Sequence, residues 1–163
     1  MTRADYLVIG GGLAGTAVAY HLARDGGADV ILLERGELNA AASGNNSGSI
    51  HAQIPLEPFV NQGEGWARRF APTLRLMMAG ISRWHELPTE LNAPELEVSA
   101  RGGLMVARRE AEMETLRRKS AIERAEGLEV HLLGRAELRA LAPYLSEDAI
   151  GAVAPAVERL CDR

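Results

Sequence analysis

The feature that most constrains this chain is a glycine-rich turn between an apolar run and a helical stretch near the N-terminus. Tyr6–Ile9 is a short apolar run of the kind found in buried parallel strands. Gly10, Gly12 and Gly15 then occupy the glycine positions of a G-x-G-x-x-G pattern, and residues 13–24 have helical character. A strand, such a turn and a helix in this order predict a βαβ unit that binds a dinucleotide.

Each glycine of the pattern has a separate physical role. Gly10 allows a sharp turn, and Gly12 allows the backbone to approach a pyrophosphate because it has no Cβ. Gly15 allows the helix to pack closely on the strand. The backbone N–H groups at Leu13 and Ala14 then lie at the positive end of the helix, where phosphate groups bind.

An acidic residue closes the second strand expected in this unit. Val30–Leu33 is apolar, and Glu34 follows it 19 positions after Gly15, with Arg35 next. A carboxylate at this place accepts hydrogen bonds from a ribose 2′-OH and repels a 2′-phosphate. The pattern therefore favours FAD or NAD over NADP.

A loop of small residues follows, where a plain NAD-binding fold would continue quickly into another helix. It is rich in Ser, Asn and Gly, so it offers backbone N–H groups and short side chains to a ligand at close range. On composition alone, a flexible surface loop is the simpler interpretation. The residues concerned are Ala42, Ser43, Gly44, Asn45, Asn46, Ser47 and Gly48.

Together, Asp5 to Glu34 and Ala42 to Gly48 resemble the FAD-dependent amine oxidoreductases of the D-amino-acid oxidase, glycine oxidase and sarcosine oxidase type. Members of that family carry a G-A-S-G-x-N-[AS]-G-like segment after the acidic strand end. Residues 101–107 are similar to a strand of the family's substrate domain, and residues 128–141 to a later strand and helix. The resemblance implies FAD as the cofactor, with the loop wrapped around its pyrophosphate.

The resemblance also implies which residues contact FAD. Some relatives attach flavin through a histidine at the position that Asn45 occupies here, so we expect FAD to be bound non-covalently. No catalytic acid or base can be assigned, and His51, three positions after Gly48, is the single candidate. A structural histidine is the alternative. The expected cofactor-binding residues are Gly10, Gly12, Leu13, Ala14, Gly15, Glu34, Arg35, Ala42, Ser43, Gly44, Asn46, Ser47 and Gly48.

The expected fold class is α/β: a Rossmann-like FAD-binding βαβ lobe with part of an α+β substrate domain, incomplete in this chain. Residues 1–70 would form the N-terminal part of the FAD-binding domain and residues 71–163 part of the substrate domain. Family members run to several hundred residues, so the FAD-binding domain would resume after residue 163 and this chain would be an N-terminal portion.

The activity implied by the resemblance is oxidation of the C–N bond of an amino acid or N-alkyl amino acid. A hydride passes to the flavin, and water hydrolyses the imine product. The substrate would be a small amine or amino acid, and the electron acceptor oxygen or a quinone. Two other functions stay open at this point. The chain could be a non-catalytic FAD-binding subunit or fragment that needs a partner, or an NAD-linked dehydrogenase lobe. A third alternative is an inactive product that folds poorly, because two parallel strands bury little surface.

Composition describes an ordinary globular chain. Hydrophobic residues make up 47%, charged residues 25%, and the net charge is −4, which argues against disorder and against nucleic-acid binding. One cysteine permits no internal disulfide, and the sequence contains no metal-ligand cluster. No apolar run approaches 18 residues and no signal peptide is evident, so we expect a cytoplasmic protein with at most peripheral membrane association.

The rest of the chain has a simple predicted organisation. A helix over residues 71–87 would end or kink at Pro88, and Gly80 within it would mark a close helix contact. Another helix is expected at 110–125, where the Arg117-Arg118-Lys119 run would be a solvated face. Strands are expected at 96–99, 104–107 and 149–154, the first two paired as a hairpin around residues 101–103.

Overall fold

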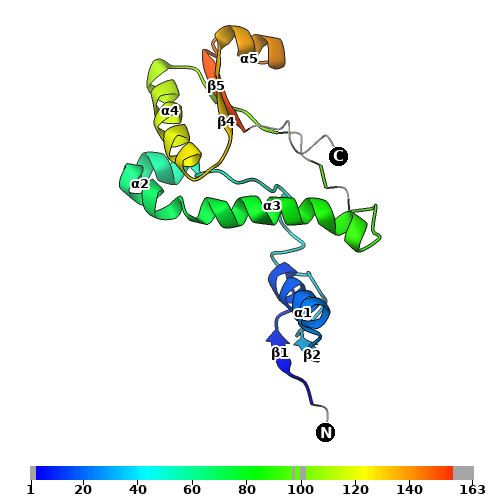
Figure 1. The fold of residues 1–163 in the computed structure, drawn as a ribbon. Coiled ribbons are helices and arrows are strands. Elements are labelled where there is room, and N and C mark those ends of the chain that lie inside the picture. The colour runs from blue at the N-terminus through cyan, green and yellow to red at the C-terminus, as the bar shows by residue number, and fades with distance from the viewer. Residues whose placement is uncertain (1–2, 97, 100–101, 156–163) are drawn as a thin grey trace. The chain divides into compact units, whose positions relative to one another are not determined.

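A computed structural model describes residues 3–96, 98–99 and 102–155 (Figure 1). The chain divides into two compact units, residues 1–49 and residues 50–163, and each is described by itself. The domain boundary expected at residue 70 refers to the domains of the family and stays a prediction. Within the described residues, no helix is both long enough and apolar enough to cross a membrane.

The N-terminal unit is the strand, turn, helix and strand that the glycine pattern predicts. Strand β1 (Tyr6–Ile9) is followed by helix α1 (Leu13–Gly26) and strand β2 (Val30–Leu33). The two strands pair in parallel over their full length, from Tyr6 opposite Val30 to Ile9 opposite Leu33. Helix α1 ends where Gly27 takes a left-handed conformation with φ of 60°, which glycine adopts without a steric penalty. The mixed α/β class is therefore confirmed.

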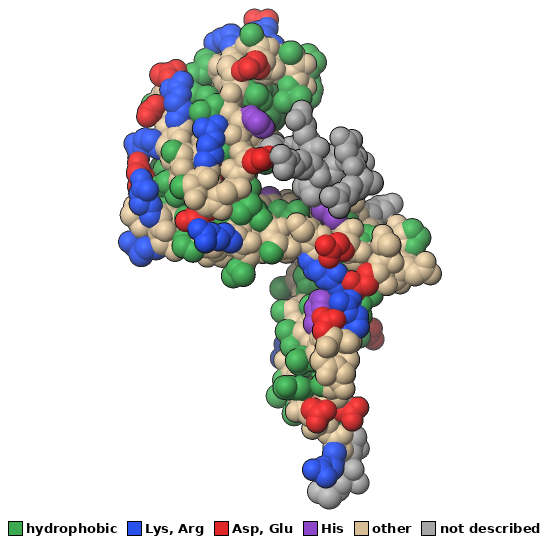
Figure 2. All heavy atoms as spheres, in the orientation of Figure 1, with side chains coloured by type: hydrophobic (Ala, Val, Ile, Leu, Met, Phe, Trp, Pro, Cys, Tyr) green, Lys and Arg blue, Asp and Glu red, His purple; other side chains and the backbone are tan. Residues whose placement is uncertain are grey.

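Apolar side chains of this unit lie on its surface, which differs from the buried strand that the sequence predicts. Leu7 is 58% exposed, Ile9 79% and Leu33 51%, and Val18 on α1 is 51% exposed. Hydrophobic side chains accordingly gather on the surface over β1, β2 and α1 in Figure 2. The reason is that the described sheet has two strands, so each strand lacks a neighbour on one edge and most of its cover.

The second unit contains four helices and a three-stranded sheet in its described part. The helices are α2 (Leu56–Phe70), α3 (Thr73–Glu90), α4 (Glu110–Ala125) and α5 (Arg135–Leu141), and the strands are β3 (Met105–Ala107), β4 (Val130–Gly134) and β5 (Gly151–Pro155). The strand order is β3-β5-β4, and both pairings are antiparallel. Met113 and Leu116 on α4 pack with Val130 and Val153 of the sheet to form one core cluster.

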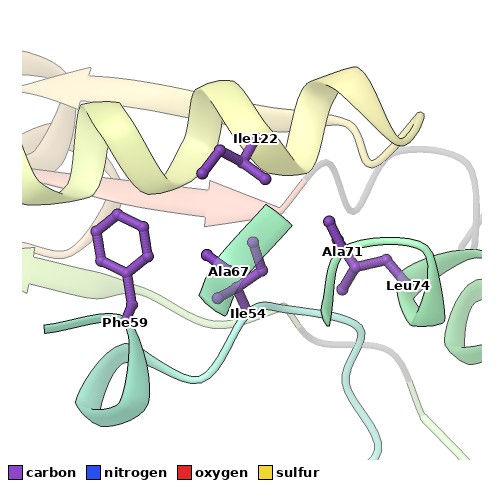
Figure 3. Packing of buried hydrophobic residues seen from close by; sticks show 6 residues of the cluster. All are labelled: Ile54, Phe59, Ala67, Ala71, Leu74 and Ile122. Atoms are coloured by element: carbon purple, nitrogen blue, oxygen red, sulfur yellow. The ribbon is translucent and has the colours of Figure 1, made fainter. Parts of the chain in front are cut away.

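A second core cluster joins the start of this unit to helices α2, α3 and α4. Ile54 precedes α2, and its side chain is fully buried beside those of Phe59, Ala67 and Ile122 (Figure 3). Ala71 and Leu74 complete the cluster, and Trp66 and Met77 pack against it as partly buried neighbours. Leu74 and Met77 are therefore the positions at which α3 contacts this core.

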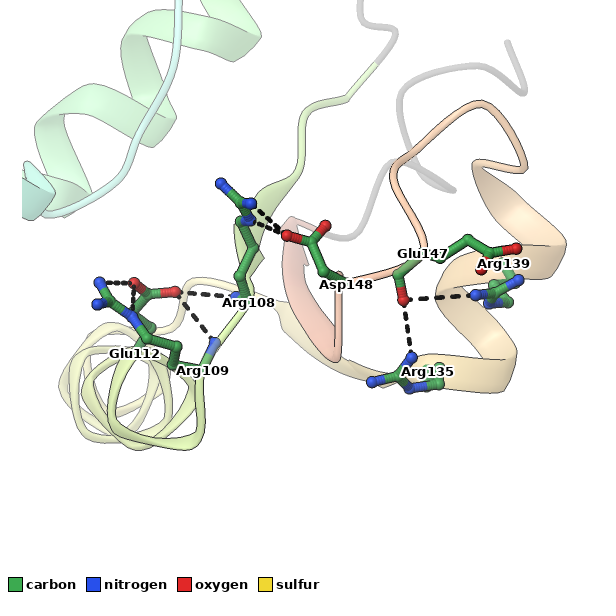
Figure 4. A network of polar contacts seen from close by, with 7 residues as sticks. All are labelled: Arg108, Arg109, Glu112, Arg135, Arg139, Glu147 and Asp148. Atoms are coloured by element: carbon green, nitrogen blue, oxygen red, sulfur yellow. Dashed lines mark hydrogen bonds and ion pairs between the residues drawn. The ribbon is translucent and has the colours of Figure 1, made fainter.

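Polar contacts on the surface fix the N-terminus of α4 and the segment before β5 (Figure 4). Arg108 forms an ion pair with Asp148, 40 residues further along the chain. Glu112 accepts hydrogen bonds from the backbone N–H groups of Arg108 and Arg109, at 2.9 and 3.2 Å. This carboxylate therefore provides a hydrogen-bond acceptor for N–H groups at the start of α4 that have no partner within the helix. Arg135 donates to the backbone oxygen of Glu147 at 2.8 Å.

Several boundaries differ from the prediction. Helix α3 continues past Pro88 to Glu90, because the loss of one N–H near the C-terminal end leaves the last turn intact, with Leu91 donating to Leu87 at 2.9 Å. Strand β3 pairs with β5, and the turn of the predicted hairpin, at residues 100 and 101, lies outside the described residues. The other strand of that hairpin falls partly outside the described residues. Among the residues that the structure describes, a Cβ at Gly80 would meet no atom within 4 Å, so the predicted close contact at this glycine is wrong.

The predicted solvated face at residues 117–119 is also wrong at one position. Arg117 and Arg118 are exposed, but Lys119 is fully buried. Its Nζ lies 2.5 Å from Oε1 of Glu123, one helical turn away and equally buried. A buried lysine requires such a partner, and the pair lies on the side of α4 that faces the core.

Candidate cofactor-binding site

The glycine turn joins β1 to α1 with little space for side chains. The N–H of Gly10 donates to the carbonyl of Leu33 on β2 at 2.8 Å, and Gly10 has φ of 109°, which side chains strongly disfavour. A Cβ built on Gly15 would lie 1.9 Å from the carbonyl oxygen of Gly10. Helix α1 therefore packs on the turn at a distance that only glycine permits, as the sequence pattern predicts.

The N-terminal end of α1 presents backbone N–H groups next to this turn. Gly12 is the N-cap residue and has an extended backbone, and the first turn of the helix carries no acidic side chain. The N–H of Leu13 donates to Oγ of Ser43 at 2.9 Å, so the loop reaches back to the helix terminus. Because Ser43 is a neutral hydroxyl, the helix terminus keeps its partial positive charge and suits an anion.

Glu34 lies across the turn from α1 and holds the backbone on both sides. Its Oε2 accepts from the N–H of Gly11 at 2.6 Å, and its Oε1 accepts from the N–H of Gly36 at 3.0 Å. These backbone hydrogen bonds, that of Gly11 first, lower the pKa of Glu34, so the carboxylate stays ionised below its usual range. Each carboxylate oxygen accepts more than one hydrogen bond, so Glu34 has capacity left for ribose hydroxyls.

The loop after β2 is folded by its own hydrogen bonds. The N–H of Asn39 donates to the carbonyl of Gly11 at 2.9 Å, which fastens the loop to the glycine turn. A Cβ on Gly44 would lie 2.2 Å from the carbonyl oxygen of Asn39, so the loop folds tightly there. Nδ2 of Asn46 donates to the carbonyl of Ser43 at 2.6 Å, and Oδ1 of Asn46 accepts from the N–H of Gly48 at 2.7 Å. The loop is thus a set of turns with defined contacts.

Turn, strand end and loop together enclose a pocket of about 220 Å³. That volume accommodates part of a dinucleotide, because pockets for whole drug-sized ligands are typically about 300–1,000 Å³. The pocket is lined by Gly12, Glu34, Arg35, Gly36, Glu37, Asn39, Ala40, Ala41 and Ser43.

The structure brings most of the predicted site residues into one place. The glycines of the turn, Leu13, Glu34 and Ser43 are linked by the contacts described above, and Arg35 lines the same pocket. Ala14, Ala42, Ser47 and Gly48 are exposed. His51 belongs to the second unit and is exposed, so its role stays a prediction. Contact of each of these residues with FAD is likewise a prediction.

Sequence analysis did not single out Gly11, Gly36 or Asn39. Gly11 is buried, and a Cβ on it would lie 2.4 Å from Cδ2 of Leu38 and 3.0 Å from Cβ of Glu34, so a larger residue there would have to displace the side chain of Leu38. The run of three glycines from Gly10 to Gly12 was the available signal. The contact of Asn39 with Gly11 depends on how the loop folds back, and no local pattern encodes it.

The residues present fit the adenosine diphosphate half of FAD. The glycine turn leaves no Cβ in the path of a pyrophosphate, the terminus of α1 provides N–H donors, and Glu34 provides a carboxylate for a ribose. When bound, FAD supplies the redox chemistry, whereas these residues bind and orient it.

Comparison with known proteins identifies the family and several relatives. Residues 5–157 match the family DAO, described as FAD dependent oxidoreductase. Human mitochondrial sarcosine dehydrogenase is 30% identical over 147 residues, which are 90% of this chain and 14% of that protein. Sarcosine oxidase subunit beta of Rhizobium meliloti is 30% identical over 145 residues, which are 88% of this chain and 31% of that protein. The chain thus spans less than a third of the length of these relatives.

Solved structures show the same fold. Glycine oxidase from Bacillus cereus aligns with 93% of this chain and 38% of its own, with a TM-score of 0.59 and 26% identity. L-alpha-glycerophosphate oxidase from Mycoplasma pneumoniae, solved with FAD bound, aligns with 95% of this chain and 38% of its own. Its TM-score is 0.61 and its identity 23%, so this likeness concerns the fold alone.

Proposed function

The chain belongs to the family of FAD dependent oxidoreductases, and we propose that its N-terminal unit holds the ADP half of non-covalently bound FAD. The observation that carries this proposal is the arrangement around the glycine turn. Glu34 bonds to the N–H groups of Gly11 and Gly36, and the terminus of α1 lies beside them. Because the family uses FAD, the NAD-linked dehydrogenase lobe is not retained.

The reaction we propose is oxidation of the C–N bond of a small amino acid or N-alkyl amino acid. The names of three relatives support this class: sarcosine dehydrogenase, sarcosine oxidase subunit beta and glycine oxidase. Bound FAD would accept a hydride from the carbon next to nitrogen, and water would hydrolyse the resulting imine. His51 is a candidate for proton transfer on this chain, and the described residues provide no stronger one.

We also propose an electron acceptor and a cellular location for this reaction. We expect oxygen or a quinone to reoxidise the flavin, and no nucleic acid to take part, because the net charge is −4. We place the protein in the cytoplasm, with at most peripheral contact with a membrane.

One observation favours a second candidate function, in which the chain binds FAD only together with further polypeptide. Leu7 and Ile9 on β1 and Leu33 on β2 are each more than half exposed, and a sheet of two strands is marginal by itself. The N-terminal unit would then bind FAD fully only when further polypeptide, from the same gene product or from a partner subunit, covers these strands. The name of the Rhizobium meliloti relative, a beta subunit, supports a partner of this kind.

The visible absorption spectrum of the purified chain tests both candidates. Flavin bands that are released into solution on denaturation would support a non-covalent FAD site that the chain forms alone. A colourless protein that stays colourless with added FAD would refute that proposal. Flavin binding that appears only after a second polypeptide is added would favour the partner-dependent function. Flavin that stays attached after denaturation would contradict non-covalent binding.

A further inference from the structure

The loop after β2 contains three asparagines, and the side chain of one of them is not used by the loop itself. Nδ2 of Asn45 donates to the carbonyl of Ala41 at 2.8 Å. Nδ2 of Asn46 donates to the carbonyl of Ser43 at 2.6 Å. Asn39 is exposed, and its amide forms no hydrogen bond within the part of the chain that the structure describes. The loop therefore leaves the amide of Asn39 available to a ligand.

The backbone of Asn39 is held between the glycine turn and the rest of the loop. Its N–H donates to the carbonyl of Gly11 at 2.9 Å, and a Cβ on Gly44 would lie 2.2 Å from its carbonyl oxygen. Asn39 also lines the pocket of about 220 Å³, together with Gly12 and Glu34. Because its N–H is bonded to Gly11 and its carbonyl packs against Gly44, the side-chain amide is the part of Asn39 that can bind a ligand in this pocket.

The backbone conformation of Asn39 does not explain why this position carries a side chain. Its φ is 59°, in the left-handed region that favours glycine. Glycine adopts this conformation without a steric penalty, and asparagine tolerates it better than most residues with a Cβ, though less well than glycine. Glycine would therefore form the turn at least as well. What asparagine adds at this position is the amide.

Resting on the proposed function, we propose that Asn39 is a further binding residue, whose Nδ2 donates a hydrogen bond to a phosphate oxygen of the ADP half of FAD. Gly11, whose carbonyl accepts from Asn39, directly precedes the N-cap residue of α1, and that end of the helix suits an anion. The carboxylates of Glu34 and Glu37 also line the pocket, and they suit ribose hydroxyls but repel a phosphate. A neutral N–H donor beside the helix terminus therefore complements the pyrophosphate.

Titrations of FAD fluorescence with variants of the full chain test this assignment. Asn39→Gly keeps the left-handed turn and removes the amide, so FAD affinity should fall roughly tenfold, the effect of losing one hydrogen bond to a charged group. Asn39→Asp replaces the N–H donors by a negative charge, so its affinity should be lower than that of Asn39→Gly. Asn92→Gly is the matched control, because Asn92 is the other described non-glycine residue with positive φ and lies in the second unit. This control should bind FAD as wild type does.

Hydrogen exchange without FAD separates loss of the amide from damage to the loop. Exchange in peptides covering residues 10–13 and 36–48 should be the same in Asn39→Gly as in wild type, and faster exchange would overturn the assignment, because the side chain would then hold the loop itself.

The affinities decide the rest. Wild-type affinity in Asn39→Gly would overturn the assignment, and so would an equal loss in Asn92→Gly. Wild-type affinity in Asn39→Asp would also overturn it, because a carboxylate can accept from a ribose hydroxyl but cannot donate to a phosphate. A wild-type chain that binds no FAD would refute the proposed function and this assignment with it, whereas FAD binding that these variants leave unchanged would refute the assignment alone.

Discussion

Replacement of the buried Lys119 by methionine should destabilise the second unit severely. Methionine has a similar volume, but it leaves the carboxylate of Glu123 fully buried with the N–H of Ile54 as its remaining donor. Removing one partner of a buried ion pair typically costs about 3–5 kcal/mol. Small domains are stable by only about 5–15 kcal/mol, so Lys119→Met should remove a large part of the total.

The double variant Lys119→Met/Glu123→Leu separates charge from packing. It removes both buried charges and leaves the N–H of Ile54 without its acceptor, which should cost about 1–3 kcal/mol. The double variant should therefore be more stable than Lys119→Met. Such a result means that the two substitutions are strongly coupled, as expected for residues in contact.

Urea unfolding followed by tryptophan fluorescence measures these differences. Both tryptophans, Trp66 and Trp84, lie in the second unit, and Trp66 packs against the cluster that contains Ile54. Burial lowers the pKa of Lys119 despite the opposing effect of Glu123, so the unfolded state binds this proton more tightly. Stability of the wild type relative to Lys119→Met should thus rise with pH from that lowered pKa up to the ordinary value of 10.5. A loss below about 1 kcal/mol in Lys119→Met, typical of exposed ion pairs, would refute the reasoning.

Three further changes have defined outcomes. Gly80→Ala should raise the free energy of unfolding by about 0.5–1 kcal/mol in the same urea assay, because Gly80 is inside α3 with open space around it; a loss of stability would reveal a contact there. Glu34→Gln should weaken FAD affinity roughly tenfold in a fluorescence titration, because a charged acceptor is lost, and unchanged affinity would exclude Glu34 from the site. The N–H of Arg108 and then the side chain of Arg109 lower the pKa of Glu112, so the stability that wild type has over Glu112→Gln should be complete above about pH 4.5. That advantage should disappear as the pH falls through the lowered pKa, and urea midpoints that differ equally at pH 7 and pH 3 would contradict this.

The N-terminal unit was predictable because its constraints are local. Gly10 and Gly15 must be glycine for reasons of turn geometry and close packing, and Glu34 follows at a spacing that one helix and one strand determine. The spacing of these residues in the sequence therefore predicted both the order of the elements and the residues that meet around the turn. The charged helix α4 was also predictable from local sequence, and its observed bounds agree with the expected 110–125.

The second unit depended on contacts that no local pattern contains. Strand β3 pairs with β5, and Met105 lies opposite Val153, whereas the local sequence favoured a hairpin. Helix α2 was not predicted, and the structure shows that Gly63 interrupts it with φ of 75° and ψ of −176°. Lys119 follows two exposed arginines and resembles them in sequence, and only its spacing of three positions from the buried Leu116 and Ile122 places it on the core-facing side of α4.

The central claim is that the glycine turn of this chain binds the ADP half of FAD, and an equilibrium titration of FAD fluorescence tests it directly. Wild type should quench the fluorescence to saturation, and ADP should compete. Gly15→Ala should abolish quenching, because its Cβ would lie 1.9 Å from the carbonyl oxygen of Gly10. Gly26→Ala, at the other end of α1 with no atom within 4 Å of its Cβ, should bind as wild type does. Saturable quenching that Gly15→Ala retains, or that all three proteins lack, would contradict the account.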